Sequence, residues 1–446
     1  MDGFRTSSPL LSIIESAAGL VAGLRKQPDL TNLITDPGDA SELQGKDSYG
    51  TAGALRVLLR ALKDEAALSA FGRLAARWDI EQRLKNLCRL RKEEMRSPEI
   101  AQEPIRAPIF VTGLPRAGTT FLQTLLSDDP DNQVPRCWQC MYPYPDRPRP
   151  GGRDTRPERL NRQLRCFNLL APDLHKVHPL NGSSPQECTE ITAHVFQSLR
   201  FDSTHRVPSY RKWLDEHGHL SAYRFHKRFL QHLQHQTGRQ RWILKSPDHV
   251  FALGALQSVY PDARVVFMHR DPVKVVQSNA QLIEILRAPF TRAVDRFQVG
   301  RQTLSDLSLG AAHMIEASRR GIFPQSQVFH LQFLDLISHP IDAVRRLYSH
   351  FGLPLGLTAE EQMSKRIAGK PNGGYAKNMY FLARHGLQLR EVEQNFRDYI
   401  DHFDVQAELP ASPIASARPS TLLRPPQKRA ATSLVRTEGF ADGIYQ

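Results

Sequence analysis

The fold is decided by residues 107–126, APIFVTGLPRAGTTFLQTLL. Residues 107–112 form a short apolar segment rich in residues that favour β-strands, which predicts a buried strand. The glycine turn 113–118 follows at once, and residues 119–126 then place their apolar side chains on one face of a predicted helix. A strand, a glycine turn and a helix in this order expose backbone N–H groups at a helix N-terminus, where they can bind a phosphate.

The two glycines of this turn have the spacing of a Walker A loop, but Thr119 stands where the Walker lysine is expected. That lysine normally reaches the β- and γ-phosphates of a triphosphate. Thr119 and Thr120 offer hydroxyls to one phosphate instead, and Arg116 inside the turn can reach a bridging oxygen. The loop therefore favours a short 5'-phosphate that carries a transferable group over ATP. The alternative is a tight turn without a ligand.

Further strands and helices alternate along the rest of the chain. The predicted strands are 241–245, 264–268 and 328–331, and the helices that follow them are 249–260, 272–287 and 340–351. Alternation of this kind predicts an α/β fold, a P-loop-type parallel sheet flanked by helices. Residues 141–160 are rich in Pro, Arg and Asp and predict a surface loop. Residues 185–235 predict helices, with an apolar face formed by Leu220, Tyr223, Phe225, Phe229, Leu230 and Leu233.

The chain divides into three expected parts. Residues 1–104 read as an N-terminal helical extension, because apolar residues recur at helical spacing between positions 53 and 95. Residues 105–405 form the predicted main domain. Residues 406–446 are rich in Pro, Ser, Ala and Arg, which predicts a flexible tail.

Composition limits the class of protein. The chain has 446 residues, 40% of them hydrophobic, and no apolar run long enough to predict a membrane span. No signal-peptide pattern is recognised, and five cysteines do not predict a disulfide framework, so we expect a cytoplasmic protein. The single CxxC, Cys137 to Cys140, is interpreted as incidental. The net charge of +13 attracts phosphates, nucleic acids and anionic membranes alike.

A second motif lies at the end of the third predicted strand. Arg270 leaves this strand, and Ser278 lies eight residues on, along the next helix. Both side chains could meet one phosphate at the carboxyl edge of the sheet, where open α/β sheets bind ligands. Arginine offers a planar fork that suits phosphate. The alternative is an Arg-Asp-Pro sequence that merely begins a helix.

Together these motifs resemble the PAPS-dependent sulfotransferases, where PAPS is 3'-phosphoadenosine 5'-phosphosulfate. The loop 115–120 is similar to their 5'-phosphosulfate loop, and Arg270 with Ser278 is similar to their 3'-phosphate site. The resemblance covers roughly residues 105–405, through segments 242–249, 334–342 and 351–354, and points to bacterial members and to the tyrosylprotein branch.

The resemblance implies roles for individual residues. Arg116 would steady the sulfuryl group and the leaving oxygen, at a place where many members have lysine, and Lys245 would face the transferring group. The expected donor ligands are Pro115, Arg116, Ala117, Gly118, Thr119 and Thr120 for the 5'-phosphosulfate, and Arg270, Ser278 and Lys370 for the 3'-phosphate. Lys370 is only loosely similar, because the usual order of basic residues and glycines is not reproduced around it.

Sulfuryl transfer resembles phosphoryl transfer in depending on positioning and charge stabilisation, so we expect in-line displacement without an essential metal. The donor would leave as PAP, 3',5'-adenosine bisphosphate. A general base would activate an acceptor hydroxyl or amine. Glu187 is the first candidate and His178 the second. The alternative for Glu187 is a capping-box acid three residues after Ser184.

Other functions stay open at this point. A P-loop kinase that uses ATP is one, and an inactive relative of the sulfotransferases is another. A third is a basic protein that binds nucleic acid or membrane through its N-terminal helices and arginine-rich tail. If the protein is an enzyme, its acceptor is a small molecule, a lipid or a sugar, without specific nucleic-acid binding. The N-terminal helices are a candidate homodimer surface.

Overall fold

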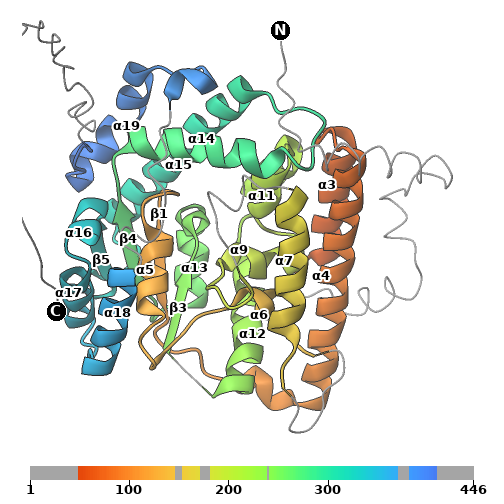
Figure 1. Ribbon diagram of the computed structural model, residues 1–446, viewed down its shortest axis with the longest axis horizontal. Coiled ribbons are helices and arrows are strands. Elements are labelled where there is room, and N and C mark those ends of the chain that lie inside the picture. The colour runs from red at the N-terminus through yellow and green to blue at the C-terminus, as the bar shows by residue number, and fades with distance from the viewer. Residues whose placement is uncertain (1–48, 146–152, 171–180, 239–240, 370–380, 409–446) are drawn as a thin grey trace, which may run out of the picture. The chain divides into compact units, whose positions relative to one another are not determined.

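The computed structural model describes residues 49–145, 153–170, 181–238, 241–369 and 381–408 (Figure 1). Within these residues five strands form one sheet in the order β2-β3-β1-β4-β5, and every neighbouring pair is parallel. The prediction of a parallel α/β fold is confirmed. The strands are β1 (Ile109–Gly113), β2 (Asn132–Gln133), β3 (Arg241–Lys245), β4 (Arg264–His269) and β5 (Val328–Gln332).

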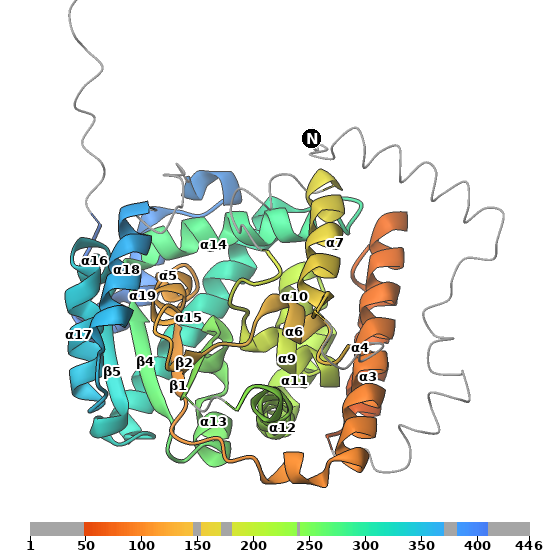
Figure 2. The ribbon, with the colours of Figure 1, turned by 60° about the horizontal axis from the view of Figure 1, so that its bottom comes forward.

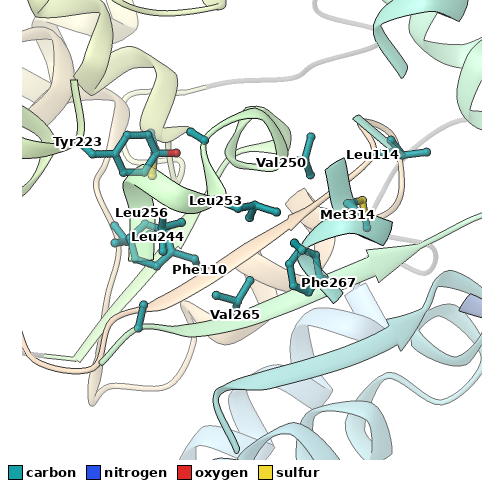
Figure 3. Close-up of a cluster of buried hydrophobic side chains, with 14 of the residues drawn as sticks. Phe110, Leu114, Tyr223, Leu244, Val250, Leu253, Leu256, Val265, Phe267 and Met314 are labelled. Carbon is teal, nitrogen blue, oxygen red and sulfur yellow. The ribbon is translucent and has the colours of Figure 1, made fainter. Parts of the chain in front are cut away.

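The central strand β1 is buried along its whole length and faces two different cores. Phe110 packs with Leu244 and Leu256 on one face of the sheet, as Figure 3 shows, whereas Ile109 and Val111 pack on the other. Alternating side chains of a strand point to opposite faces, so a strand that is apolar at every position needs a layer of helices on each side.

Helices supply those two layers. Side chains of α5, α16, α17 and α18 share the core that contains Ile109, and side chains of α12, α13, α15 and α19 share the core that contains Phe110. No helix within the described ranges is long and apolar enough to cross a membrane. The helices are α3 (Thr51–Asp64), α4 (Ala70–Arg96), η2 (Pro98–Gln102), α5 (Thr119–Leu126), α6 (Cys137–Met141), α7 (Arg156–Leu170), α9 (Cys188–Thr192), η3 (Ala193–Val195), α10 (Arg200–Thr204), α11 (Pro208–His217), α12 (Leu220–Thr237), η4 (Pro247–Phe251), α13 (Leu253–Val259), α14 (Pro272–Arg287), α15 (Arg296–Arg320), η5 (Gln325–Gln327), α16 (Phe333–Ser338), α17 (Pro340–His350), α18 (Leu357–Gly369), η7 (Leu382–His385) and α19 (Leu389–Phe403).

The helices α3 and α4 lie on the side of the described unit away from β5 (Figure 2). Their apolar stripes form a third core with α10 and α11, in which Leu55 and Leu84 are buried together with Phe201 and Tyr210. The helical character predicted for this part of the sequence is confirmed, because its apolar residues at helical spacing find a partner surface within the same chain.

The structure corrects three sequence-based predictions. The predicted loop 141–160 is wrong at its end, because α7 begins at Arg156, whose backbone N–H donates to the Asp154 carboxylate at 3.0 Å. The predicted helix 249–260 is a 3-10 turn followed by the shorter α13. Leu220, predicted to belong to the apolar face of residues 185–235, is 40% exposed because it is the first residue of α12.

Candidate active site

The turn between β1 and α5 requires glycine at two positions. Gly113 has a φ of +137°, and a Cβ there would lie 2.3 Å from the carbonyl oxygen of Met268. Gly118 has a φ of +89°, and a Cβ there would lie 2.9 Å from the Phe333 ring. Only glycine tolerates both the left-handed backbone and the close approach. The loop is therefore pressed against the end of β4 and against the residue that follows β5.

The helix α5 begins at Thr119 with Gly118 at its N-cap, and no described side chain caps it. The first N–H groups of a helix have no intrahelical partner, and the helix dipole adds partial positive charge at this end. The start of α5 therefore has the backbone donors and the partial positive charge that an anion site needs. Arg116 in the turn has a φ of +67°, unusual for a residue with a Cβ.

Arg116, Arg270 and Ser278 meet at the carboxyl edge of the sheet, although they are 154 and 162 residues apart in sequence. Nη1 of Arg270 donates to the carbonyl oxygen of Arg116 at 2.6 Å, and Nε of Arg116 donates to Oγ of Ser278 at 2.9 Å. Asp271 caps α14 by accepting from the backbone N–H of Val273 at 2.8 Å. This cap fixes the start of the helix that carries Ser278.

Lys245, Glu187 and Thr120 form the second part of the site. Lys245 is the last residue of β3, its side chain is only 2% exposed, and its Nζ forms a very short ion pair with Oε1 of Glu187. The same Nζ donates to Oγ1 of Thr120, the second residue of α5, at 3.2 Å. The ammonium therefore lies beside the N-terminal end of α5, and 27% of the Glu187 side chain remains exposed to solvent.

Glu187 occupies the N-cap position of α9, but its side chain makes no capping bond. The capping-box alternative is therefore wrong for this residue, since the carboxylate pairs with Lys245 instead. Exposure of part of the carboxylate is compatible with the role of a base, which sequence reasoning assigned to it.

A cluster of buried charges anchors α9 to the N-terminal helices. Arg83 from α4 donates to the carboxylate of Glu190 at 2.8 Å, and Arg200 bridges Glu190 and Asp79. Burial alone would raise the pKa of Asp79, but Arg200 and Arg83 hold it at about 2. The helical extension therefore fixes the element that presents Glu187.

Asp248 lies three residues after Lys245, in the 3-10 turn η4. Its backbone N–H donates to Oγ of Ser246 at 3.1 Å. Burial, and after it the negative charge of Glu187, raise the pKa of the Asp248 carboxyl to about 7. The structure therefore adds to the site a carboxyl group that changes its charge near neutral pH, and sequence reasoning did not single it out.

Two other residues were missed. The Phe333 ring lies under the Arg270 guanidinium, with its centroid 3.9 Å from Cζ, and Glu408 forms an ion pair with the same guanidinium. Phe333 could have been found, because it lies two residues after the predicted strand 328–331 and so must lie at the same edge of the sheet. Nothing in the sequence around Glu408 indicates this contact.

Two predicted site residues, His178 and Lys370, lie outside the described residues. Cys137 and Cys140 are both buried free thiols in α6. Burial raises the pKa of Cys137 to about 12, so this thiol stays protonated at neutral pH. No group of residues within the described ranges is arranged to hold a metal ion.

The residues present fit a doubly anionic nucleotide. Two glycine positions leave a cradle that a Cβ would fill, the N-terminus of α5 is uncapped, and Arg116, Lys245 and Arg270 gather around it. Positively charged donors at the carboxyl edge of a parallel sheet define the class: a P-loop-type protein that binds an anionic nucleotide.

Comparisons with known proteins specify the family. The sulfotransferase family matches residues 108–356, more than half of the chain, so the protein belongs to this family. The omega-hydroxy-beta-dihydromenaquinone-9 sulfotransferase Stf3 of Mycobacterium bovis is 28% identical over 313 residues, which are 68% of this chain and 76% of that protein.

Two solved structures share the fold. Sulfotransferase STF1 of Mycobacterium tuberculosis H37Rv has a TM-score of 0.69 and 28% identity, covering 86% of this chain and 97% of that one. Sulfotransferase STF9 of Mycobacterium avium has a TM-score of 0.69 and 25% identity, covering 91% and 99%. The prediction of a bacterial-type, PAPS-dependent sulfotransferase is confirmed. The protein is an enzyme that transfers a sulfuryl group from PAPS and releases PAP, and the kinase and non-enzymatic alternatives are wrong.

Proposed function

We propose that the two groups of residues described above divide the work of sulfuryl transfer. Gly118, Thr119 and Thr120 bind the 5'-phosphosulfate at the start of α5, together with Pro115 and Ala117 of the loop. Arg270 and Ser278 bind the 3'-phosphate. The observation that carries this proposal is the meeting of Arg116, Arg270 and Ser278 in one hydrogen-bonded chain beside that helix end. Lys370 remains a candidate for the same phosphate.

Arg116 and Lys245 are the groups that stabilise charge. PAPS, when bound, supplies an activated sulfuryl group on its 5'-phosphate. Lys245 is held by Thr120 beside the first turn of α5, where its ammonium offsets negative charge without needing to reorganise. No step in this scheme requires a metal.

Glu187 is the proposed general base, and His178 is the second candidate. The Glu187 side chain is 27% exposed beside Lys245, so an acceptor hydroxyl can reach its carboxylate and donate a proton to it. If this is correct, Glu187→Gln should lower kcat by about 10²-fold or more while leaving the affinity for PAP within about twofold. Equal loss of turnover and PAP affinity would instead make Glu187 a support for Lys245.

The acceptor we propose is a hydroxylated, lipid-like molecule. Stf3 is named for a hydroxylated menaquinone, and the helix that carries Ser278 offers an apolar surface in this chain. Leu282 and Ile285 lie on the same face of α14 as Ser278 by helical periodicity. Both are half-buried, and neither belongs to the hydrophobic cores formed by the described residues.

Aromatic side chains continue this surface beyond the end of α14. Phe290 stacks on Phe71 and on Phe167 with ring centroids 6.0 Å apart in each case. On α4, Leu74 and Trp78 follow Phe71 at helical spacing and are 48% and 45% exposed. We propose that these apolar side chains of α14 and α4 bind the hydrocarbon chain of the acceptor.

The length of the acceptor chain tests this assignment. Primary alcohols of 4, 8 and 12 carbons should be sulfated with kcat/KM that rises with length, because each buried CH₂ contributes up to about 0.8 kcal/mol. Leu282→Ser with Ile285→Ser should flatten the rise, whereas Leu309→Ser, at an exposed position of α15, should not. A kcat/KM that is independent of chain length, or highest for phenols and sugars, would refute the lipid assignment.

The donor assignment is tested by calorimetry without added metal. PAP should bind far more tightly than 5'-AMP, and ATP with Mg²⁺ should bind weakly. Binding of ATP in preference to PAP would overturn the assignment.

The organisation of the chain is proposed as an N-terminal helical extension (1–104), a sulfotransferase domain (105–405) and a tail (406–446). A cytoplasmic location agrees with five free cysteines. We expect no specific nucleic-acid partner, and a homodimer through the N-terminal helices remains a prediction.

A further inference from the structure

The guanidinium of Arg270 is already paired with a carboxylate. Nε of Arg270 donates to Oε1 of Glu408 at 2.6 Å, and Nη2 donates to Oε2 at 3.1 Å. Two prongs of the fork therefore bind two oxygens of one anionic group, which is the arrangement that arginine also forms with phosphate. The third nitrogen, Nη1, is used by the carbonyl oxygen of Arg116.

Glu408 is brought to this position by several contacts besides the ion pair. Its backbone N–H donates to Oδ2 of Asp271 at 3.0 Å. Before it, Val405 is 7% exposed, and the Gln332 side chain at the end of β5 donates to the carbonyl oxygen of Phe403 at 2.9 Å. The chain after α19 thus follows the edge of the sheet up to Arg270. The ion pair between Glu408 and Arg270 is therefore supported by the packing of the preceding residues.

Geometry prevents Glu408 and a phosphate from sharing Arg270. The Phe333 ring covers one face of the guanidinium, with its centroid 3.9 Å from Cζ, and Nη1 already donates to the Arg116 carbonyl oxygen. Only the edge formed by Nε and Nη2 can therefore bind an anion. Two anions on one edge would repel each other. A phosphate can carry more negative charge than the single charge of a carboxylate and can also reach Ser278, so it is the stronger competitor for this edge.

We propose that Glu408 is a further donor-site residue, which occupies the position of the 3'-phosphate in the donor-free enzyme and is exchanged for that phosphate on binding. The exchange keeps Arg270 aligned while the site is empty, weakens binding of the nucleotide, and favours release of PAP after transfer. This inference rests on the proposed role of Arg270 in binding the 3'-phosphate.

Calorimetric titration of PAP and of 5'-AMP tests the exchange. Glu408→Ala should tighten PAP binding about three- to tenfold, as expected for loss of a partly exposed ion pair that competes with the ligand. Glu408→Gln should act in the same direction but less. Binding of 5'-AMP, which has no 3'-phosphate, should stay unchanged. The matched control is Glu360→Gln, which removes a carboxylate–arginine pair with Arg345 on α17 and should change neither affinity.

A double-mutant cycle assigns the effect to Arg270. In an Arg270→Ala background, Glu408→Ala should no longer tighten PAP binding. If Arg270→Ala weakens PAP binding but neither Glu408 variant tightens it, the exchange is refuted while the donor site stands. If Arg270→Ala leaves PAP binding intact, both the donor-site assignment and the exchange are refuted. Thermal unfolding of each variant shows whether the chain remains folded, and Glu408→Gln keeps the test decisive if Glu408→Ala unfolds.

Discussion

Replacing Arg270 with alanine should remove the enzyme's preference for nucleotides with a 3'-phosphate. Nε and Nη2 of Arg270 reach two oxygens of one anionic group at 2.6 and 3.1 Å, so the fork is shaped for a bidentate contact. A hydrogen bond to a charged group contributes about 1.5–3 kcal/mol. Allowing for water that replaces the lost side chain, we expect a loss of about 3 kcal/mol, which weakens PAP binding about 10²-fold.

The assay is calorimetric titration of wild-type enzyme and variants with PAP and with 5'-AMP. Affinity for 5'-AMP should change by less than about twofold, because the 5'-phosphate lies at the start of α5. Arg270→Lys should be intermediate, since it keeps the charge and loses the fork. The control is Arg264→Ala, at the opposite end of the same strand, where the guanidinium lies over Phe351.

One result would refute this reasoning. Nη1 of Arg270 also supports the turn by donating to the carbonyl oxygen of Arg116. If Arg270→Ala weakens PAP and 5'-AMP binding equally, Arg270 supports the turn 113–118 and does not bind the 3'-phosphate. The stability of the variant should fall by no more than about 1 kcal/mol, because the pair with Glu408 is partly exposed.

Three further predictions follow from the site. Lys245→Met should lower kcat by about 10²–10³-fold, measured as release of PAP from PAPS with an acceptor alcohol, because a buried ammonium beside α5 is lost. Gly113→Ala should abolish PAP binding and lower the melting temperature, because its Cβ would collide with the Met268 carbonyl. Asp248→Asn should flatten the pH dependence of stability. The pKa of the Asp248 carboxyl is about 7 in the native state and about 3.9 in the unfolded state. Between these two pH values the carboxyl is protonated in the native state but not in the unfolded state. Wild-type stability therefore falls as pH rises through this window, by up to about 1.4 kcal/mol per pH unit relative to the variant in urea unfolding.

Each of these has an opposing outcome. Unchanged kcat in Lys245→Met would remove the ammonium from the transfer step, and Lys245→Arg serves as the charge-conserving control. Normal PAP binding by Gly113→Ala would mean that the turn is not the phosphate cradle. Parallel stability curves for Asp248→Asn and wild type between pH 4.5 and 7.5 would show that Asp248 titrates normally.

Local sequence determined the parts of this protein that depend on neighbouring residues. The strand, glycine turn and helix of residues 107–126 were predictable because the backbone at Gly113 and Gly118 admits no other residue and the apolar periodicity changes on either side. The position of Arg270 at the carboxyl edge of the sheet was also predictable, because it follows a predicted strand and all strands of a parallel sheet end at the same edge. The long helix α15 was not anticipated, because its hydrophobic stripe becomes clear only against the sheet that it covers.

Only the tertiary structure decided which distant charges meet. The pairing of Lys245 with Glu187 and of Arg270 with Glu408 joins residues 58 and 138 positions apart, and no local pattern encodes such distances. Burial in the assembled fold, not the sequence around it, raises the pKa of Asp248. The motifs thus specified an anion-binding loop and the family that uses it, whereas the charge state and the partners of its side chains depend on how the whole chain packs around them.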